Sequence, residues 1–112
     1  MSKLIIGEVI FVLVTQEHLD EGKLNWLERH DLPKPFGYFC PVSLAIQEVL
    51  NISDVCVYAK DGGEIEVENN VVKFILSPSL KFISDQNLFD HQEDCSPTSG
   101  FIVITEVQSI ID

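Results

Sequence analysis

The run Val9–Val14 constrains the fold of this chain more than any other segment. All of its residues are apolar and most are β-branched, which favours a pleated strand over a helix. An apolar side chain at every position, rather than at every second one, is typical of a strand whose two faces are both covered. We therefore expect Val9–Val14 to be a central strand of a buried sheet, with Gly7 marking a bulge just before it.

Two helices are indicated, one directly after this strand and one in the middle of the chain. Thr15 is a typical N-cap and Gly22 a typical helix end, so a short helix is expected over 16–21. Pro41 fits the first position of a second helix over 41–50, because a missing N–H costs nothing there. This second helix has an apolar stripe of Val42, Ala45, Ile46, Val49 and Leu50 and an opposite polar face of Ser43, Gln47 and Glu48.

The middle of the chain predicts a three-stranded meander. A strand over 54–59 leads through a glycine-containing turn into a hairpin partner over 64–68. Asn69 and Asn70 tolerate positive φ, so they predict a second tight turn into a strand over 71–76. Strands that are joined by tight turns pair antiparallel, so most of the sheet is expected to be antiparallel.

The last part of the chain predicts one more helix and one more strand. Ser77 and Pro78 are typical of a helix start, and residues 101–107 predict a final strand. The helix is apolar on two sides, formed by Leu80 and Ile83 and by Phe82 and Phe89. The chain thus predicts a single α+β domain over 1–112, a two-layer sandwich with two or three helices on one face of a mostly antiparallel five-stranded sheet.

The chain is strongly acidic, since 18 Asp and Glu against 7 Lys and Arg give a formal net charge of −11. Such a charge repels the phosphates of nucleic acids and of anionic lipids, so we expect neither nucleic acid nor a membrane as a direct partner. It favours docking onto a basic surface of another protein. An acidic surface that serves only solubility explains the same composition, and the sequence leaves both explanations open.

The sequence carries no motif for a metal or a cofactor. Its three cysteines lack C-x-x-C spacing, and its glycines form no nucleotide-binding motif. His91 and Cys95 are the nearest pair of possible metal ligands, but no second pair completes them. The apolar run near the N-terminus is interrupted by Glu8 and is too short to span a bilayer. We therefore expect a cytoplasmic protein without disulfides, metal or cofactor.

Cys40 is the candidate for catalysis, because it directly precedes Pro41 at an expected helix start. A thiolate at that position is stabilised by unpaired N–H groups and the helix dipole. His18, His30 or His91 would have to supply the base that activates it. No local motif places a histidine beside Cys40, and a small buried residue at a helix start is the more common reason for such a cysteine.

Two groups of side chains are candidates for binding a partner, an aromatic cluster and a row of carboxylates. Aromatic rings are enriched at protein interfaces, and acidic residues at every second position of a strand point to one face, about 6.7 Å apart. Such a row imitates the charge of a nucleic-acid backbone, although a solvated strand face explains it too. The residues are Trp26, Phe36 and Tyr38 in the cluster and Glu64, Glu66 and Glu68 in the row.

Two motifs resemble those of a family of small uncharacterised proteins from bacterial genomes and phages. The family pattern is T-x-x-D/H-I-x-x-G followed by C-P-[IV]-A-L-A, and the corresponding segments Thr15–Gly22 and Cys40–Ala45 are TQEHLDEG and CPVSLA. The chain departs from the pattern at Ser43, where alanine is usual, and by an insertion over 23–39. The family has no assigned activity, so the resemblance implies a fold and a mobile-element context, and no functional residue is carried over.

These observations predict a non-enzymatic interaction protein, in its sharpest form a phage-like acidic inhibitor or decoy of a basic host protein. The alternative is a small cysteine-dependent enzyme that uses Cys40. A homodimer is also expected, formed by the last helix or the aromatic segment, because more apolar residues are present than one small core can bury. The surplus residues are Trp26, Phe36, Tyr38, Phe39, Phe82, Phe89, Ile110 and Ile111.

Overall fold

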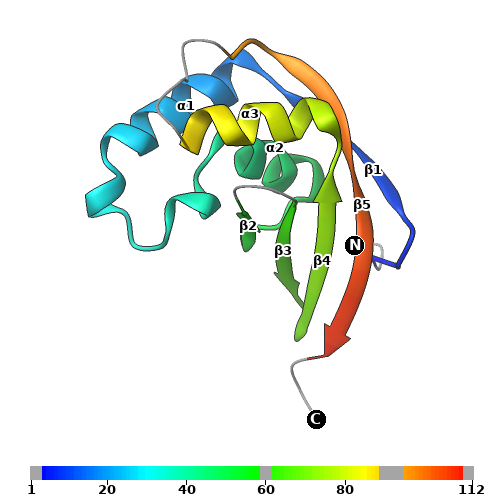
Figure 1. The fold of residues 1–112 in the computed structure, drawn as a ribbon. Helices are drawn as coiled ribbons and strands as arrows, with labels where there is room; N and C mark the ends of the chain where they lie inside the picture. The colour runs from blue at the N-terminus through cyan, green and yellow to red at the C-terminus, as the bar shows by residue number, and fades with distance from the viewer. Residues whose placement is uncertain (1–3, 59–61, 89–94, 110–112) are drawn as a thin grey trace.

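Five antiparallel strands form one curled sheet, and three helices lie against its concave side (Figure 1). The computed structural model describes residues 4–58, 62–88 and 95–109. The strands are β1 (Val9–Val14), β2 (Val55–Val57), β3 (Gly62–Val67), β4 (Asn70–Leu76) and β5 (Thr98–Ser109), in the order β1-β5-β4-β3-β2 across the sheet. The helices are α1 (Gln16–Leu27), α2 (Pro41–Leu50) and α3 (Pro78–Leu88), with short 3-10 helices η1 (Arg29–Asp31) and η2 (Phe36–Tyr38) between α1 and α2. The α+β class and the antiparallel five-stranded sheet with its helices are thus confirmed.

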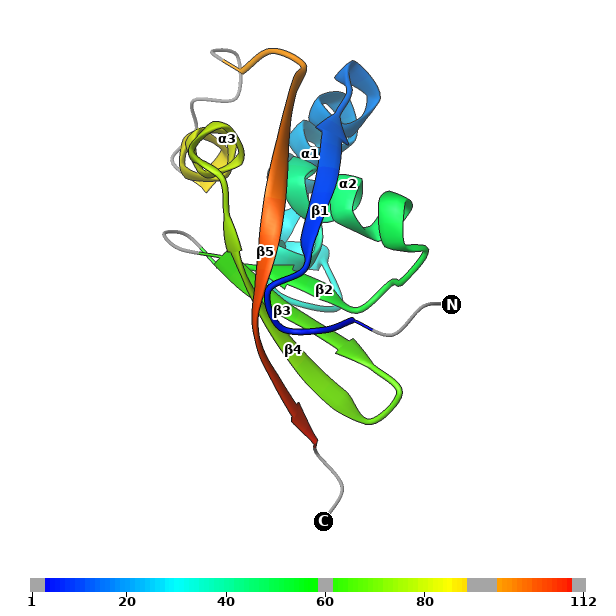
Figure 2. The same ribbon diagram turned by 90° about the vertical axis from the view of Figure 1, so that its right-hand side faces the viewer.

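The core lies between the concave face of the sheet and the helices. Ile102 and Ile104 of β5 are fully buried there, as are Leu80 of α3 and Ile46 of α2. Gly100 lies on the same face as Ile102 and lets α3 approach the sheet, because a Cβ atom at this position would fall 2.6 Å from the Leu80 Cγ atom. Figure 2 shows β1 and β5 toward the viewer, with α1 and α2 behind and beside β1 and with α3 on the other side of β5.

β1 is an edge strand and not the central strand that its composition predicts. In the described part of the chain its one strand neighbour is β5. Val12 and Val14 are buried, whereas Val9, Phe11 and Leu13 on the other face are 50%, 77% and 60% exposed. The uniform apolar composition therefore reflects one face in the core and one apolar face open to solvent. The predicted burial of both faces is wrong.

α1 extends well beyond the expected helix over 16–21, because Gly22 does not end it. Gly22 is buried within α1 and lies against Pro41 of α2. The N-cap is as expected, since the Thr15 hydroxyl accepts a hydrogen bond from the His18 N–H. In the local sequence, a glycine at a contact between two helices looks the same as a glycine that ends a helix. Here the contact with Pro41 explains why Gly22 lies inside the helix.

α2 has the predicted bounds, but two of its side chains lie on faces other than those expected. Ser43, predicted on the polar face, is fully buried and donates a 2.6 Å hydrogen bond to the Val55 carbonyl of β2. Val49, predicted in the apolar stripe, is 50% exposed. The reason is the position of α2, which packs against both β1 and β2 and buries the side of the helix that carries Ser43.

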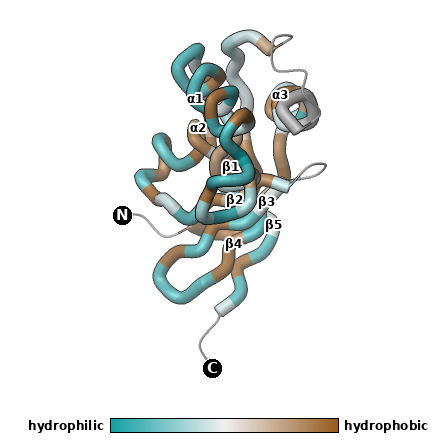
Figure 3. Tube along the Cα trace, turned by 90° about the vertical axis from the view of Figure 1, so that its left-hand side faces the viewer, coloured by the Kyte–Doolittle hydropathy of each residue, from teal (hydrophilic) through white to brown (hydrophobic). Residues whose placement is uncertain are grey.

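β2, β3 and β4 form the expected meander, but β2 ends at Val57, Gly62 and Gly63 belong to β3 and not to the first turn, and the second turn is shifted by one residue. Glu68 and Asn69 occupy this turn with φ of 49° and 67°, and Asn70 already belongs to β4. Two successive positive φ angles are typical of a type I′ hairpin turn. Glu68 is therefore not part of the carboxylate row, which consists of Glu64 and Glu66. Figure 3 shows the tip of this hairpin as hydrophilic and its strands as alternating apolar and polar bands.

β5 begins at Thr98 rather than at the expected residue 101, and its first residues pair with the end of β1. This pairing gives the last strand a position between β1 and β4. A register shift next to Lys73 and Phe74 of β4 marks a bulge that adds to the curl of the sheet. Three of the surplus apolar residues, Phe89, Ile110 and Ile111, lie outside the described residues.

Candidate functional site

The segment 36–39 lies along the outer edge of β2. η2 packs against β2, and Gly37 is so close that a Cβ atom there would fall 2.6 Å from the Val57 carbonyl oxygen. Gln47 of α2 holds the segment in place by donating a 2.8 Å hydrogen bond to the Tyr38 carbonyl. The aromatic segment therefore covers one of the two edges of the sheet.

Trp26 and Phe36, two of the predicted partner-binding residues, contact each other. Their ring centroids are 5.1 Å apart in an edge-to-face arrangement. The Arg29 guanidinium lies 4.1 Å from the centre of the Trp26 ring and also donates a 2.8 Å hydrogen bond to the Trp26 carbonyl. Both rings are half-buried. Side chains of the protein itself therefore cover much of the surface that these rings offer.

Tyr38, the third predicted aromatic residue, lies beside Lys34. The Lys34 ammonium is 4.8 Å from the ring centre and donates a 2.9 Å hydrogen bond to Asp54. Asp54 raises the pKa of Lys34, first through this hydrogen bond and then through its charge, with smaller contributions from Tyr38 and Glu66. The Asp54 carbonyl accepts a 2.9 Å hydrogen bond from the Glu66 N–H of β3, so Lys34 connects the aromatic segment to the part of the sheet next to Glu66.

Tyr58 follows β2 and interacts with Glu64 of β3. Desolvation of the phenol, together with its hydrogen bond to the Glu64 carboxylate, raises the pKa of Tyr58 to about 12. The phenol therefore keeps its proton at neutral pH and donates a hydrogen bond to the carboxylate. Tyr58 directly follows β2, and Tyr38 belongs to η2, which packs against β2, so both tyrosines lie at the same edge of the sheet. The ring of Tyr58 remains half-exposed.

The structure thus gathers part of the predicted partner-binding set into one surface. We call Tyr38, Tyr58, Glu64 and Glu66 the acidic–aromatic surface. The sequence predicts three of its members but not Tyr58, because it indicates a strand over 54–59, whereas β2 ends at Val57 and leaves Tyr58 just beyond the strand. Glu68 is not part of this surface, because it lies in the turn after β3. Trp26 and Phe36 are not part of it either, because their rings contact each other.

Cys40 is the N-cap of α2 and is almost completely buried. Its sulfur accepts a 3.4 Å hydrogen bond from the Ser43 N–H and lies 3.9 Å from the Gly37 carbonyl oxygen. Burial raises the pKa of the thiol to about 11, even though the hydrogen bonds act in the opposite direction. A thiol with this pKa keeps its proton at neutral pH, so the geometry supports a structural cap rather than a nucleophile.

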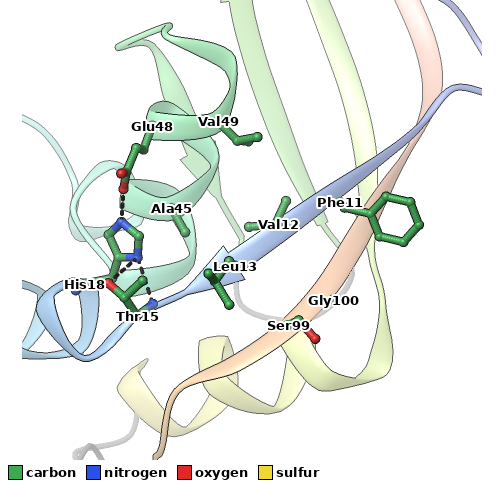
Figure 4. A pocket seen from close by; sticks show the side chains of 10 residues that line it. All are labelled: Phe11, Val12, Leu13, Thr15, His18, Ala45, Glu48, Val49, Ser99 and Gly100. Carbon is green, nitrogen blue, oxygen red and sulfur yellow. Dashed lines mark hydrogen bonds and ion pairs between the residues drawn. The ribbon is translucent and has the colours of Figure 1, made fainter.

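A groove of about 340 Å³ runs between β1 and α2 (Figure 4). Its walls are mostly apolar and consist of Phe11, Val12, Leu13, Ala45, Val49, Ser99 and Gly100, with Thr15, His18 and Glu48 at one end. His18 accepts a 2.9 Å hydrogen bond from the Thr15 N–H through Nδ1 and contacts Glu48 through Nε2. Because both ring nitrogens are engaged, His18 serves as a helix cap and as a link between α1 and α2.

An exposed apolar face lies on the outer side of β1, β5 and β4. Phe11 and Phe101 are direct cross-strand neighbours, and they are 77% and 38% exposed. We call Val9, Phe11, Leu13, Ile75 and Phe101 the outer apolar face. No signal in the sequence of β1 itself reveals this face, because burial of both sides and exposure of one apolar side give the same run of residues.

No three His, Cys, Asp or Glu side chains come together as metal ligands in the described part of the chain, and His91 lies outside it. Within the same residues no helix is long and apolar enough to cross a bilayer. Comparison of the chain with models of known protein families, with curated proteins and with solved structures finds no match. The case for a function therefore rests on the residues of this chain.

Proposed function

We propose that this chain is a non-enzymatic interaction protein that binds a basic surface of another protein through its acidic–aromatic surface. The observation that carries the proposal is that Glu64 and Glu66 of β3, Tyr58 directly after β2 and Tyr38 of η2 all lie at the β2 edge of the sheet. The chain as a whole also carries a net charge of −11.

The chemistry of this surface suits lysine and arginine side chains. Carboxylates such as Glu66 accept charge-assisted hydrogen bonds, and arginine binds them in a bidentate geometry. Tyrosine rings offer a face to a cation, and Lys34 already occupies Tyr38 in this way. The negative charge of the whole molecule adds long-range attraction and speeds the approach of a basic partner.

The alternative, a cysteine-dependent enzyme, has weaker support. Cys40 is buried, and its pKa is raised to about 11. His18 is the one histidine lining the groove beside β1, and both of its ring nitrogens have partners. Cys40 therefore offers no accessible thiolate, and the groove offers no histidine that is free to act as a base.

In its sharpest form, the proposed partner is a host protein whose basic groove binds nucleic acid, and the chain is a phage-like decoy for that groove. Glu64 and Glu66 supply negative charge on one strand face, in support of this idea. The charge is partly offset, because Lys73 lies across from both Glu64 and Glu106 and forms a 3.8 Å ion pair with Glu106. To attract a basic groove, the decoy therefore needs the net negative charge of the whole molecule in addition to Glu64 and Glu66.

Selection of binders from a library of displayed random peptides tests the proposal without a known partner. We expect the selected peptides to be rich in Lys and Arg, and their affinity to fall as salt is added. The double variant Glu64→Gln/Glu66→Gln should weaken binding by about tenfold or more, since charge-assisted contacts are lost. The matched control is Glu17→Gln/Glu21→Gln, which removes the same charge from exposed positions on α1.

The two variants separate a specific surface from a general effect of charge. Equal loss of affinity in both would show that net charge alone attracts the peptides, and selection of neutral or acidic peptides would contradict a basic partner. A Tyr58→Leu variant that binds as tightly as the original chain would remove the aromatic part of the proposal.

A further inference from the structure

We infer that two copies of this chain form a two-fold dimer by pairing their β1 strands into one continuous sheet. This inference goes beyond the proposed function, because it concerns the sheet edge opposite the acidic–aromatic surface. β2 and β1 are the two ends of the strand order. A dimer through β1 therefore leaves the acidic–aromatic surface of each copy free for another partner.

The two edges of the sheet are protected very differently. β2 has three residues, and the segment 36–39 packs along it. β1 has six residues, VIFVLV, with no charge, proline or glycine among them. Natural edge strands usually carry charged side chains or proline, and these residues prevent pairing with the edge of another chain. The unprotected edge is therefore the one that is available for another strand.

The free edge of β1 presents a regular set of backbone groups. The Ile104 N–H donates to the Glu8 carbonyl at 3.0 Å, so Glu8 bonds toward β5. Because bonding direction alternates along an antiparallel strand, Ile10, Val12 and Val14 also bond toward β5. The N–H and C=O groups of every second residue, Val9, Phe11 and Leu13, consequently point to the free edge. The next outward N–H, that of Thr15, is bound by His18.

These three residues define a self-complementary register. If Phe11 lies opposite Phe11 of the second copy, Val9 lies opposite Leu13 and Leu13 opposite Val9. Each of these pairs exchanges two hydrogen bonds, so every outward group of β1 gains a partner. A shift of the register in either direction leaves part of the strand unpaired. The antiparallel arrangement around a two-fold axis also closes the assembly at two copies.

The side chains on both faces of β1 suit the same arrangement. The outer apolar face exposes on the order of 500 Å² of apolar side chain, which is near the upper end for a monomer. In the dimer the Phe11 and Phe101 rings of the two copies form one apolar row. On the inner side, the groove beside β1 and the half-exposed Val49 face the incoming strand. Of the outer apolar face, only the β1 side chains gain neighbours across the new strand pair, because Phe101 and Ile75 lie one and two strands away from it. The pairing therefore depends on the hydrogen bonds of the strand edge and on the contacts around Phe11 and the groove.

Electrostatics predicts how the dimer responds to salt. Two copies of charge −11 repel each other, but none of that charge lies within β1. The contact therefore has an apolar centre, and the carboxylates of Glu8 and Glu48 lie toward its rim. Added salt screens the repulsion without weakening the centre, so we expect association to become tighter as salt rises.

Sedimentation equilibrium of the whole chain at moderate salt tests the inference. We expect a mass twice the 12.6 kDa of one chain. Phe11→Asp puts two like charges opposite each other at the two-fold axis, and it should weaken the dimer by more than about tenfold. The matched control is Phe82→Asp, on an exposed phenylalanine of α3 that the sequence suggested as an interface, and it should keep the mass of the dimer.

Amide hydrogen exchange supplies a second readout that does not depend on a variant. The amides of Val9, Phe11 and Leu13 should become protected as the protein concentration rises, while those of the β3–β4 turn stay unchanged. A single-chain mass at high concentration would overturn the inference, as would a dimer that survives Phe11→Asp and dissociates with Phe82→Asp. The Glu64→Gln/Glu66→Gln variant should still dimerise, so failure of the proposed function is distinguishable from failure of the dimer.

Discussion

Gly22 of α1 lies against the ring of Pro41 at the start of α2, and a Cβ atom at position 22 would fall 2.4 Å from the Pro41 Cγ and Cδ atoms. The contact sets the spacing of the two helices. Because Pro41 is the first residue of α2, the same contact also fixes where α2 begins relative to α1. The His18–Glu48 contact joins these helices at a second point.

Gly22→Ala is expected to destabilise the protein, although alanine is the better helix former by about 1 kcal/mol. The added methyl group overlaps the Pro41 ring, and overpacking of this kind costs about 1–3 kcal/mol. We expect a net loss in the free energy of unfolding, measured by urea denaturation. Lys23→Ala, at the next and exposed position of α1, should be nearly neutral. A rise in the melting temperature of Gly22→Ala would show that the helices can separate without cost.

His18 is expected to matter for stability through its cap on α1. His18→Ala leaves the Thr15 N–H without its side-chain acceptor, and we expect a loss of about 1–2 kcal/mol in the free energy of unfolding. His18→Gln should lose less, because glutamine at this position completes the reciprocal cap with Thr15. Denaturant midpoints of the two variants provide the comparison. If both lose the same amount, the contact with Glu48 is the more important one.

Cys40→Ser is expected to keep the fold, since a serine hydroxyl can accept the Ser43 N–H that the sulfur now accepts. Cys40→Ala removes this acceptor and should be less stable than Cys40→Ser. Thermal unfolding followed by circular dichroism gives the order of the two variants. Complete unfolding of Cys40→Ser would show that the site tolerates no hydroxyl, and that packing of the sulfur outweighs the cap.

Alkaline pH is expected to destabilise the protein through the same thiol. Burial raises the pKa of Cys40 from 9.0 to about 11. Between these values the unfolded chain has lost the thiol proton and the folded chain has kept it, so stability falls as pH rises through this window. Cys40→Ser should remove this part of the pH dependence. An identical decline in the variant would assign the effect to other groups, such as Tyr58.

Salt is expected to stabilise the folded chain at neutral pH, because 18 carboxylates against 7 basic side chains repel one another. The melting temperature at pH 7 should rise with added sodium chloride, and it should also rise when the pH is lowered slightly. Sucrose at matched osmolality is the control for effects other than screening. A melting temperature that is indifferent to salt would mean that the charges are already compensated.

Capping and turn residues predicted the helix starts and the hairpin turn, which depend on interactions between neighbours in the sequence. The bounds of α2 follow from Cys40, Pro41 and Asn51, and the structure places Asn51 at φ 56° as the cap that ends the helix. The β3–β4 hairpin follows from its asparagines, with an error of one residue in the turn. Thr15 likewise starts α1 as expected.

The features that the sequence did not predict depend on contacts between distant segments. Gly22 is a helix interior rather than a helix end only because Pro41 lies against it. β1 is an edge strand because β5 lies on its inner side and no other described strand pairs with its outer side. The acidic–aromatic surface was predicted in part, since three of its residues were named, but Tyr58 joined it through the end of β2. Residue composition alone does not indicate which distant segments become neighbours.

The pairing of β1 with β5 has a consequence for the nascent chain. Val9 pairs with Val103, so the ribosome completes the first strand long before it makes the partner of that strand. At about 5–20 residues per second, the interval is on the order of ten seconds. During this time the six apolar residues of β1 have no sheet to join. β1 can join the sheet only after β5 has been made, and chaperones that bind extended apolar segments have that interval in which to act.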